Sequence, residues 1–327
     1  MVSTKYILYP LLACLSLLSV STAMAQSSNK ADVAALRQKE DSLREVAARI
    51  VMAREPADRF RADSLFTRML VRALKIPYSF SYPFDSIIHI SKLYSPDSVF
   101  RIFTWQVVRD ENLNRRHGAI QVRTTDGSLK LFPLIDRTSV ISHAIDTVTN
   151  NEWWLGSIYY KIIQKKTNNA DYYTLLGYDE NTMKSTKKRI EVLSFDDTGK
   201  PVFGGPFFSF EEDSVRKPMQ SRFWIEYKKE GNARLQFDQE MDMIIYDHLI
   251  SENNEPDKKY TYIPDGDYEG FKWKNGKWVH VDKVFNFALK DGEAPVIAPL
   301  GEDKMGTKNA PSAPPPAKPK KKTGGGK

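Results

Sequence analysis

Three acidic residues alternate in the C-terminal third of the chain, at Asp238, Glu240 and Asp242. Glycoside hydrolysis uses a pair of carboxyl groups, one as the acid and one as the base or nucleophile. If this stretch is extended, the three side chains share one face of a strand, because successive residues point to opposite faces. The same pattern is typical of the solvated face of an ordinary strand. The acids between Asp238 and Asp247 therefore support a carbohydrate-active hydrolase only as the alternative hypothesis.

A second acidic group is similar to the start of a calcium-binding loop. Residues 265–270 place Asp265, Asp267 and Glu269 at alternate positions, followed by a glycine. The last position of an EF-hand loop supplies a bidentate glutamate, but this chain has Gly276 there. An EF-hand is therefore excluded. A looser metal site built from Asp265, Asp267 and Glu269 stays a hypothesis beside the simpler one, a polar turn that leads into a strand.

The sequence carries no motif for nucleophilic catalysis or cofactor binding. Its five histidines are scattered singly, and no spacing places two of them on one face as metal ligands. There is no Gly-x-Ser-x-Gly elbow, and the one cysteine is Cys14. We therefore expect no cofactor. The leading hypothesis is a non-enzymatic binding or envelope-associated module of unknown ligand, and an enzyme is less favoured.

Aromatic residues offer another way to bind a ligand, because an exposed tryptophan presents a large flat apolar face. Trp153 and Trp154 are adjacent, so in a strand their rings point to opposite faces. One ring is then free for a ligand while the other is in the core. The other four tryptophans are better explained as core residues of an antiparallel sheet. The ligand-binding candidates are therefore Trp153, Trp154, Asp238, Glu240 and Asp242.

The N-terminus predicts export. Lys5 precedes an apolar run, and Ala23-Met24-Ala25 gives the small-x-small pattern that signal peptidase accepts. We expect residues 1–25 to be a signal peptide, which leaves a thiol-free protein in the periplasm or at the cell surface. In the alternative interpretation, Cys14 ends a lipoprotein signal and becomes a lipid-anchored N-terminus. No other apolar stretch approaches the roughly 18 to 20 residues that a transmembrane segment needs.

The formal charge of +7 is concentrated at the C-terminus. Residues 304–327 hold seven lysines and no acid, whereas residues 26–303 hold 40 basic and 41 acidic residues. The folded part is therefore balanced, and nucleic acid is not an expected partner. Residues 291–327 are rich in Pro, Lys and Gly and predict a disordered tail. Such a tail suits a weak contact with an anionic envelope surface.

The rest of the chain divides into a helical segment and a β domain. Residues 26–75 predict a helical arm or hairpin, with helices over residues 30–54 and 58–75 and the first ended by Pro56. Residues 76–290 alternate β-branched and aromatic runs with turns, which predicts an antiparallel β domain. The fold class is therefore mainly β, with a meander or sandwich as the leading arrangement. A small β-propeller with blades of about fifty residues is the alternative.

The strongest local signal in the β domain is Asn275-Gly276, which predicts a two-residue hairpin because both positions favour positive φ. Flanking aromatic residues support strands on both sides of it. The predicted strands are residues 99–108, 118–124, 129–135, 155–164, 172–178, 188–194, 222–228, 233–237, 243–248, 270–274 and 277–281.

Five stretches of the β domain together resemble a group of uncharacterised exported bacterial proteins. The resemblance implies no activity, substrate or site residue. Independently of this resemblance, the expected partner of an exported binding module is an envelope protein or a glycan. The stretches are residues 98–105, 118–121, 172–178, 191–203 and 243–248.

Overall fold

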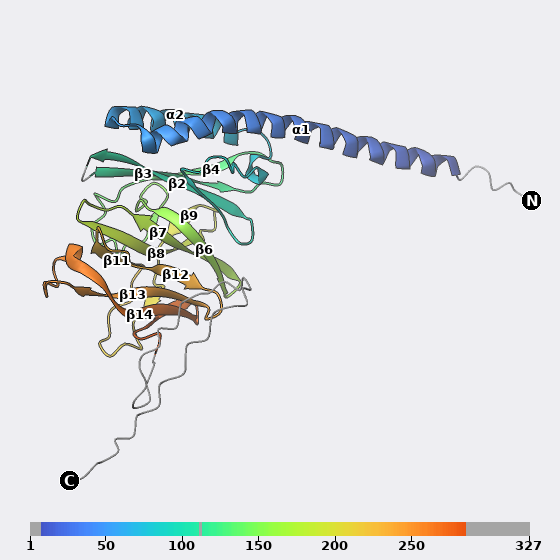
Figure 1. The fold of residues 1–327 in the computed structure, drawn as a ribbon. Coiled ribbons are helices and arrows are strands. Elements are labelled where there is room, and N and C mark those ends of the chain that lie inside the picture. The colour runs from blue at the N-terminus through green and yellow to red at the C-terminus, as the bar shows by residue number, and fades with distance from the viewer. Residues whose placement is uncertain (1–7, 111–112, 286–327) are drawn as a thin grey trace, which may run out of the picture. The chain divides into compact units, whose positions relative to one another are not determined.

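A pair of helices begins the fold and lies on the first sheet (Figure 1). The computed structural model describes residues 8–110 and 113–285, and its helical pair is α1 (Leu8–Met52) and α2 (Pro56–Leu74). Pro56 occupies the first turn of α2, where its missing N–H costs no hydrogen bond. Pro56 therefore begins the second helix. The prediction that it ends the first helix is wrong, because α1 already stops at Met52.

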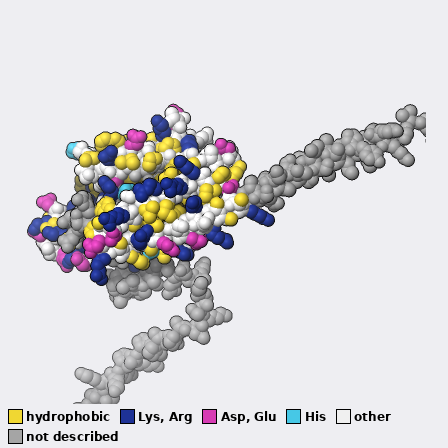
Figure 2. Space-filling view, turned by 90° about the horizontal axis from the view of Figure 1, so that it is seen from above, with side chains coloured by type: hydrophobic (Ala, Val, Ile, Leu, Met, Phe, Trp, Pro, Cys, Tyr) yellow, Lys and Arg dark blue, Asp and Glu magenta, His cyan; other side chains and the backbone are white. Residues whose placement is uncertain are grey.

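Basic residues are frequent on the outward side of the helical pair. Figure 2 looks onto this layer and shows Lys and Arg side chains across it, among hydrophobic ones. The inward side packs on a sheet face, as the apolar contacts below show. The two helices are therefore a covering layer for this sheet.

Three sheets follow the helices. The first sheet is ordered β1 (Ser91–Tyr94), β2 (Phe100–Asp110), β3 (Leu113–Val122), β4 (Lys130–Ile135). The middle sheet is ordered β5 (Thr149–Asn150), β9 (Pro201–Phe203), β8 (Ser185–Phe195), β7 (Ala170–Asp179), β6 (Ile158–Thr167), with β11 (Arg222–Lys228) also paired to β8. The third sheet is ordered β10 (Phe208–Ser209), β15 (Lys277–Val281), β14 (Tyr262–Lys274), β13 (Met243–Ser251), β12 (Leu235–Asp238). Two 3-10 helices, η1 (Ser79–Ser81) and η2 (Lys259–Thr261), lie in the connections.

The fold is mainly β, as predicted: the sheets are open and built almost wholly of antiparallel pairs. Figure 1 shows the helical pair, the first sheet, the middle sheet and the third sheet as successive layers. A layered sandwich therefore describes the fold. The propeller alternative is wrong, because the sheets stack face to face and do not close around an axis. Among the described strand pairs, only β10 and β15 run parallel.

Most predicted strands form, and the errors have local causes. All eleven predicted runs overlap a strand, and the predicted hairpin has positive φ at Asn275 and Gly276. β14 begins at Tyr262, eight residues before its predicted start, because Pro264 and the acids around Gly266 are typical of a turn. The four strands that were not predicted, β1, β5, β9 and β10, have at most four residues each.

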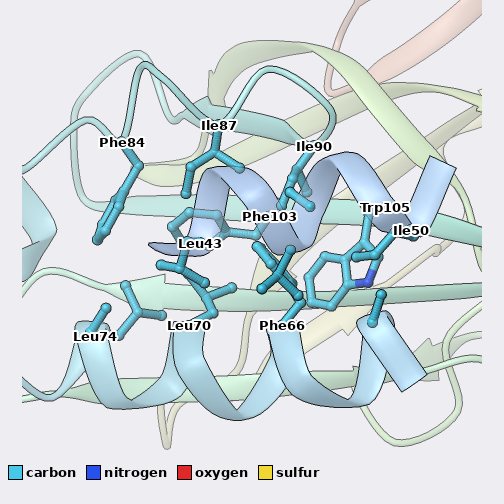
Figure 3. Close-up of a cluster of buried hydrophobic side chains, with 14 of the residues drawn as sticks. Leu43, Ile50, Phe66, Leu70, Leu74, Phe84, Ile87, Ile90, Phe103 and Trp105 are labelled. Carbon is cyan, nitrogen blue, oxygen red and sulfur yellow. The ribbon is translucent and has the colours of Figure 1, made fainter. Parts of the chain in front are cut away.

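The helical layer is held by its own apolar core (Figure 3). Leu43 of α1 and Phe66 of α2 are fully buried, and both helices meet the face of β2 that carries Phe103 and Trp105. The Phe66 ring meets the Trp105 ring edge-on, with their centroids 5.2 Å apart. Two acidic residues also lie in this layer: Asp63 accepts a hydrogen bond from Trp105 Nε1 at 2.7 Å, and Glu40 accepts one from the Tyr82 hydroxyl at 2.5 Å.

Two further apolar layers separate the sheets. The opposite face of β2 packs on the middle sheet, because residues along a strand alternate between faces. Phe100 and Ile102 from this face join Leu175 and Leu193 of the middle sheet in one cluster. A third cluster joins the middle sheet to the third sheet. Its largest fully buried residues are Trp278, Tyr246 and Phe208.

No helix in the described ranges is long and apolar enough to cross a membrane. The predicted tail, residues 291–327, lies outside the described residues. The signal peptide and the lipid anchor at Cys14 stay predictions.

Truncating the helical core should destabilise the protein strongly. Leu70 is 3 % exposed between the helices and the first sheet. We expect Leu70→Ala to lower the free energy of unfolding by about 2–5 kcal/mol, because it removes apolar contacts and leaves a cavity. Urea denaturation measures the change. The control is Val51→Ala on the outward side of α1, which should change the value by less than about 0.5 kcal/mol. Equal effects would contradict the packing described here.

Candidate functional site

A pocket of about 730 Å³ opens where one end of the first sheet meets the middle sheet. Its wall combines β3, the segment after β4, the end of β7 with the turn that follows, and β8. Five of its residues are basic and two are acidic. Five uncharged polar residues and Phe60 of α2 are also part of the lining. The charged lining residues are Arg115, Arg116, Arg137, Lys187, Arg189, Asp136 and Asp179.

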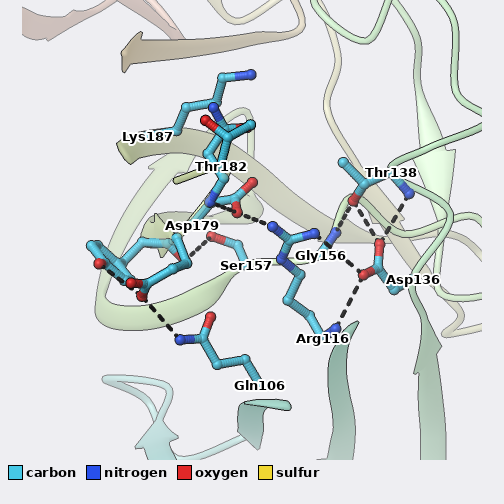
Figure 4. A network of polar contacts seen from close by, with 12 residues as sticks. Gln106, Arg116, Asp136, Thr138, Gly156, Ser157, Asp179, Thr182 and Lys187 are labelled. Atoms are coloured by element: carbon cyan, nitrogen blue, oxygen red, sulfur yellow. Dashed lines mark hydrogen bonds and ion pairs between the residues drawn. The ribbon is translucent and has the colours of Figure 1, made fainter. Parts of the chain in front are cut away.

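Arg116 is the central side chain of this pocket (Figure 4). It is 8 % exposed and donates through Nη2 to Asp179 Oδ1, while its Nη1 lies 3.7 Å from Asp136 Oδ2. Asp136 in turn holds the segment after β4, because its Oδ1 accepts from the backbone N–H and the hydroxyl of Thr138 at 3.0 and 2.6 Å. The ion pairs of Arg116 thus connect the first sheet to the middle sheet.

Arg189 of β8 forms the inner side of the same pocket. It is 3 % exposed, its Nη1 donates to the carbonyl groups of Leu155 and Gly156 at 3.1 Å, and its Nη2 donates to Asp179 Oδ2 at 3.4 Å. Gly156 is required at its position, since a Cβ atom there would lie 2.6 Å from Arg116 Cδ and 2.7 Å from Asp136 Cγ. Close approach of the backbone therefore lets the two arginines share Asp179.

Both buried arginines keep a donor without a partner. The Nε atoms of Arg116 and Arg189 are buried and make no hydrogen bond among the described residues. A buried donor without a hydrogen-bond partner destabilises the folded protein by about 1–3 kcal/mol. An acceptor that reached such a donor would remove this cost. Five cations against two carboxylates also give the pocket an excess of positive charge. The arrangement is suited to an anionic group.

Arginine burial alone does not explain these free donors. Arg222 is fully buried and all five of its N–H groups are used: Nε donates to Glu191 at 3.0 Å, and the Nη atoms donate to three carbonyl groups and one hydroxyl. Arg101, 1 % exposed, uses each of its three nitrogens, although burial lowers its pKa to about 10. Every nitrogen of Arg222 and Arg101 is therefore used within the fold, whereas Arg116 and Arg189 each keep one donor unpaired.

The two tryptophan candidates differ in exposure, although neither lies in one of the named strands, as the alternation argument had assumed. Trp154 is fully buried and donates from Nε1 to the Tyr159 hydroxyl at 2.7 Å. Trp153 is 52 % exposed, and the Arg137 guanidinium lies over its ring, 5.8 Å from the centroid. Because Arg137 lines the pocket, Trp153 sits beside the pocket rim. Of the two, only Trp153 offers a ring face to a ligand.

Asp238, Glu240 and Asp242 do not share a strand face. Only Asp238 is in β12; Glu240 and Asp242 lie in the turn before β13, where Asp242 has φ of 51°. Asp238 Oδ1 accepts from the Met241 N–H at 2.9 Å, and Asp242 pairs with Lys165 at 2.5 Å. The extended geometry considered for a hydrolase is therefore wrong, because this sequence forms a hairpin turn. Asp247, in β13, is buried, which raises its pKa.

Asp265, Asp267 and Glu269 lie along β14; Asp265 and Glu269 share His248 as a partner, whereas Asp267 pairs elsewhere. Asp265 Oδ2 is 2.7 Å from His248 Nδ1, and Asp267 pairs with Lys283 at 3.8 Å. Glu269 lies between two histidines, 3.7 Å from His248 Nε2 and 3.4 Å from His280 Nε2. In the described ranges, no group of three or more His, Cys, Asp or Glu residues is arranged to hold a metal ion.

Comparison of the chain with protein-family models, with curated proteins and with solved structures gave no match. The resemblance to uncharacterised exported proteins therefore stays a prediction.

The pocket residues were not identified from the sequence. Arg115, Arg116, Lys187 and Arg189 lie in strands, where charged residues usually mark a solvated face. One signal was present: basic residues are consecutive in both strands, at Arg115-Arg116 and at residues 187–189, and consecutive residues point to opposite faces, so not all of them can lie on one solvated face. No sequence pattern identifies their partners Asp136 and Asp179, because these residues meet the arginines only when the first sheet packs on the middle sheet.

His280 gives a testable pH dependence. It is 4 % exposed; burial lowers its pKa, but hydrogen bonds to Glu269 and Asp213 outweigh this and raise the pKa above 6.5. A histidine whose pKa is raised by folding stabilises the protein fully below its unfolded pKa, and this stabilisation is lost as pH rises through the folded pKa. We expect the difference in unfolding free energy between wild type and His280→Gln to be largest below about pH 6.5 and to shrink above it.

Urea denaturation of wild type and of His280→Gln at pH values above and below 6.5 measures this difference in unfolding free energy. Taking the difference between the two proteins cancels the contribution of the other titrating groups. His89→Gln, a partly exposed histidine before β1, is the matched control. A wild-type to His280→Gln difference that is constant with pH would show that His280 does not carry a raised pKa.

Proposed function

We propose that this protein is an exported, non-enzymatic binding module of the cell envelope that takes an anionic group of a glycan into the arginine pocket. The observation that carries the proposal is the charge of one pocket, whose lining holds five cations and two carboxylates; two of the cations, Arg116 and Arg189, are more than nine-tenths buried. The excess positive charge is complemented by a carboxylate or phosphate group.

The residue types in the pocket favour recognition over catalysis. Arginine stays protonated at any physiological pH, so it holds charge and donates hydrogen bonds but does not exchange protons. The two lining carboxylates, Asp136 and Asp179, are already paired with arginines. Arg116, Arg189, Asp136 and Asp179 therefore provide fixed electrostatic complementarity rather than an acid and a base.

Trp153 supports a sugar as the carrier of the anionic group. Its half-exposed ring is beside Arg137 at the pocket rim. A flat indole face gives apolar contact area at small conformational cost. A ligand with a charged substituent and a ring would thus use Arg116 and Arg189 inside and Trp153 outside. The envelope location rests on the predicted signal peptide of residues 1–25.

Matched pairs of sugars test the proposal by calorimetry. Glucose 1-phosphate and galacturonate should bind, whereas glucose and galactose, which lack the charge, should not. Arg137→Gln should weaken binding of the charged sugars by about tenfold or more, the value of one charge-assisted hydrogen bond. Trp153→Ala should weaken the same binding, because it removes the stacking face.

Arg123→Gln is the control, an exposed arginine on the loop after β3 that is not part of this pocket. It should leave the affinity unchanged. Equal binding of neutral and charged sugars, or full binding by Arg137→Gln, would contradict the proposed site.

A further inference from the structure

The layers of this protein carry opposite charge at the two ends of the stack. Residues 30–75, the helical layer, contain eleven basic and seven acidic residues. Two of those acids, Glu40 and Asp63, are buried, so five remain near the surface. Residues 235–285, which supply most of the third sheet, contain six basic and eleven acidic residues. The balanced total therefore conceals a positive helical face and a negative opposite end.

The positive charge is ordered along α2. Arg61, Arg68, Arg72 and Lys75 follow one another at spacings of seven, four and three residues, which places them on one side of the helix. All four are exposed, and Phe66 and Leu70 hold the other side in the core. The four cations therefore form a stripe on the outward side of the helical layer, the side shown in Figure 2.

Few acids neutralise this stripe. Arg61 pairs with Asp58 at 3.0 Å, but both side chains are more than half exposed, so the pair contributes little. Arg68, Arg72 and Lys75 have no hydrogen bond or ion pair from their side chains within the described ranges. Their charges are available to a partner.

Apolar residues accompany the cations at one end of the layer. Val51 and Met52 of α1 are 57 % and 71 % exposed. Met52 also lines a groove of about 570 Å³ between the two helices, together with Arg49 and Arg61. Exposed apolar side chains between basic residues are typical of helices that lie in a lipid headgroup region.

We propose that the outward face of the helical layer docks on an anionic lipid bilayer, with the third sheet directed away from it. Charge complementarity selects this occupant: cations meet the lipid phosphates, and the acidic end of the stack is kept at a distance. Each basic residue near an anionic membrane raises the partition coefficient by about fivefold. Val51 and Met52 enter the headgroup region beside Arg49. This docking is independent of the arginine pocket.

Cosedimentation of the exported protein, purified with its native N-terminus and its lysine-rich tail, with vesicles tests the docking. Vesicles of phosphatidylglycerol and phosphatidylcholine should bind the protein, and phosphatidylcholine alone should not. The triple variant Arg68→Gln, Arg72→Gln and Lys75→Gln should lower the partition coefficient roughly a hundredfold. The matched control replaces three exposed lysines of the middle and third sheets, Lys166→Gln, Lys200→Gln and Lys272→Gln.

The control removes the same charge and keeps both termini, so it isolates the helical face from the lysine-rich tail. It should lower the partition coefficient by less than fivefold. Equal losses in the two triple variants would overturn the proposal, as would equal binding to both kinds of vesicle. Circular dichroism establishes that each variant folds. Poly-glutamate is added as a competitor; if it binds through α2 while vesicles do not, the partner is an acidic polypeptide and bilayer docking is wrong.

Discussion

The stacking of the first sheet on the middle sheet depends on one buried carboxylate. Asp179 ends β7, is 1 % exposed, and accepts from Arg116 of β3 and Arg189 of β8. Two guanidinium groups could not be buried at this boundary without it, because an uncompensated buried charge is strongly destabilising. A buried ion pair need not add net stability, but once one charge is buried its partner must lie beside it. Asp179 thereby sets how the two sheets lie against each other.

Sharing one carboxylate between two arginines has a consequence for chemistry. One carboxylate, Asp179, cannot neutralise the two positive charges of Arg116 and Arg189. The second carboxylate, Asp136, lies 3.7 Å from Arg116 and accepts hydrogen bonds from Thr138. The boundary therefore keeps a positive excess and two unused donors. Arg222 shows the contrasting solution: Glu191 compensates its charge and every donor is filled. The same residue type is thus structural in one place and able to bind in another.

Local patterns predicted the elements but not their assembly. A run of β-branched and aromatic residues predicted β2, and Asn275-Gly276 predicted the hairpin between β14 and β15, because both signals act within a few residues. The stretch around Asp242 was considered as extended but forms a turn, because Asp238 accepts from Met241 and closes it. The pocket was beyond such patterns, since Arg116 and Asp179 are 63 residues apart and meet only when two sheets stack.

The charge distribution explains how a protein whose composition pointed away from nucleic acid can still carry positive surfaces. Near-equal totals of basic and acidic residues exclude a uniformly positive surface, but they do not limit how charge is divided among layers. In this stack the arginine pocket and the basic stripe of α2 both lie beside the first sheet. Phe60 of α2 lines the pocket and also packs against the helical core. The acids are concentrated in residues 235–285 at the other end. This layered fold separates charge because each layer is built mainly from one stretch of sequence with its own composition. Electrostatic function in such a fold has to be assessed layer by layer.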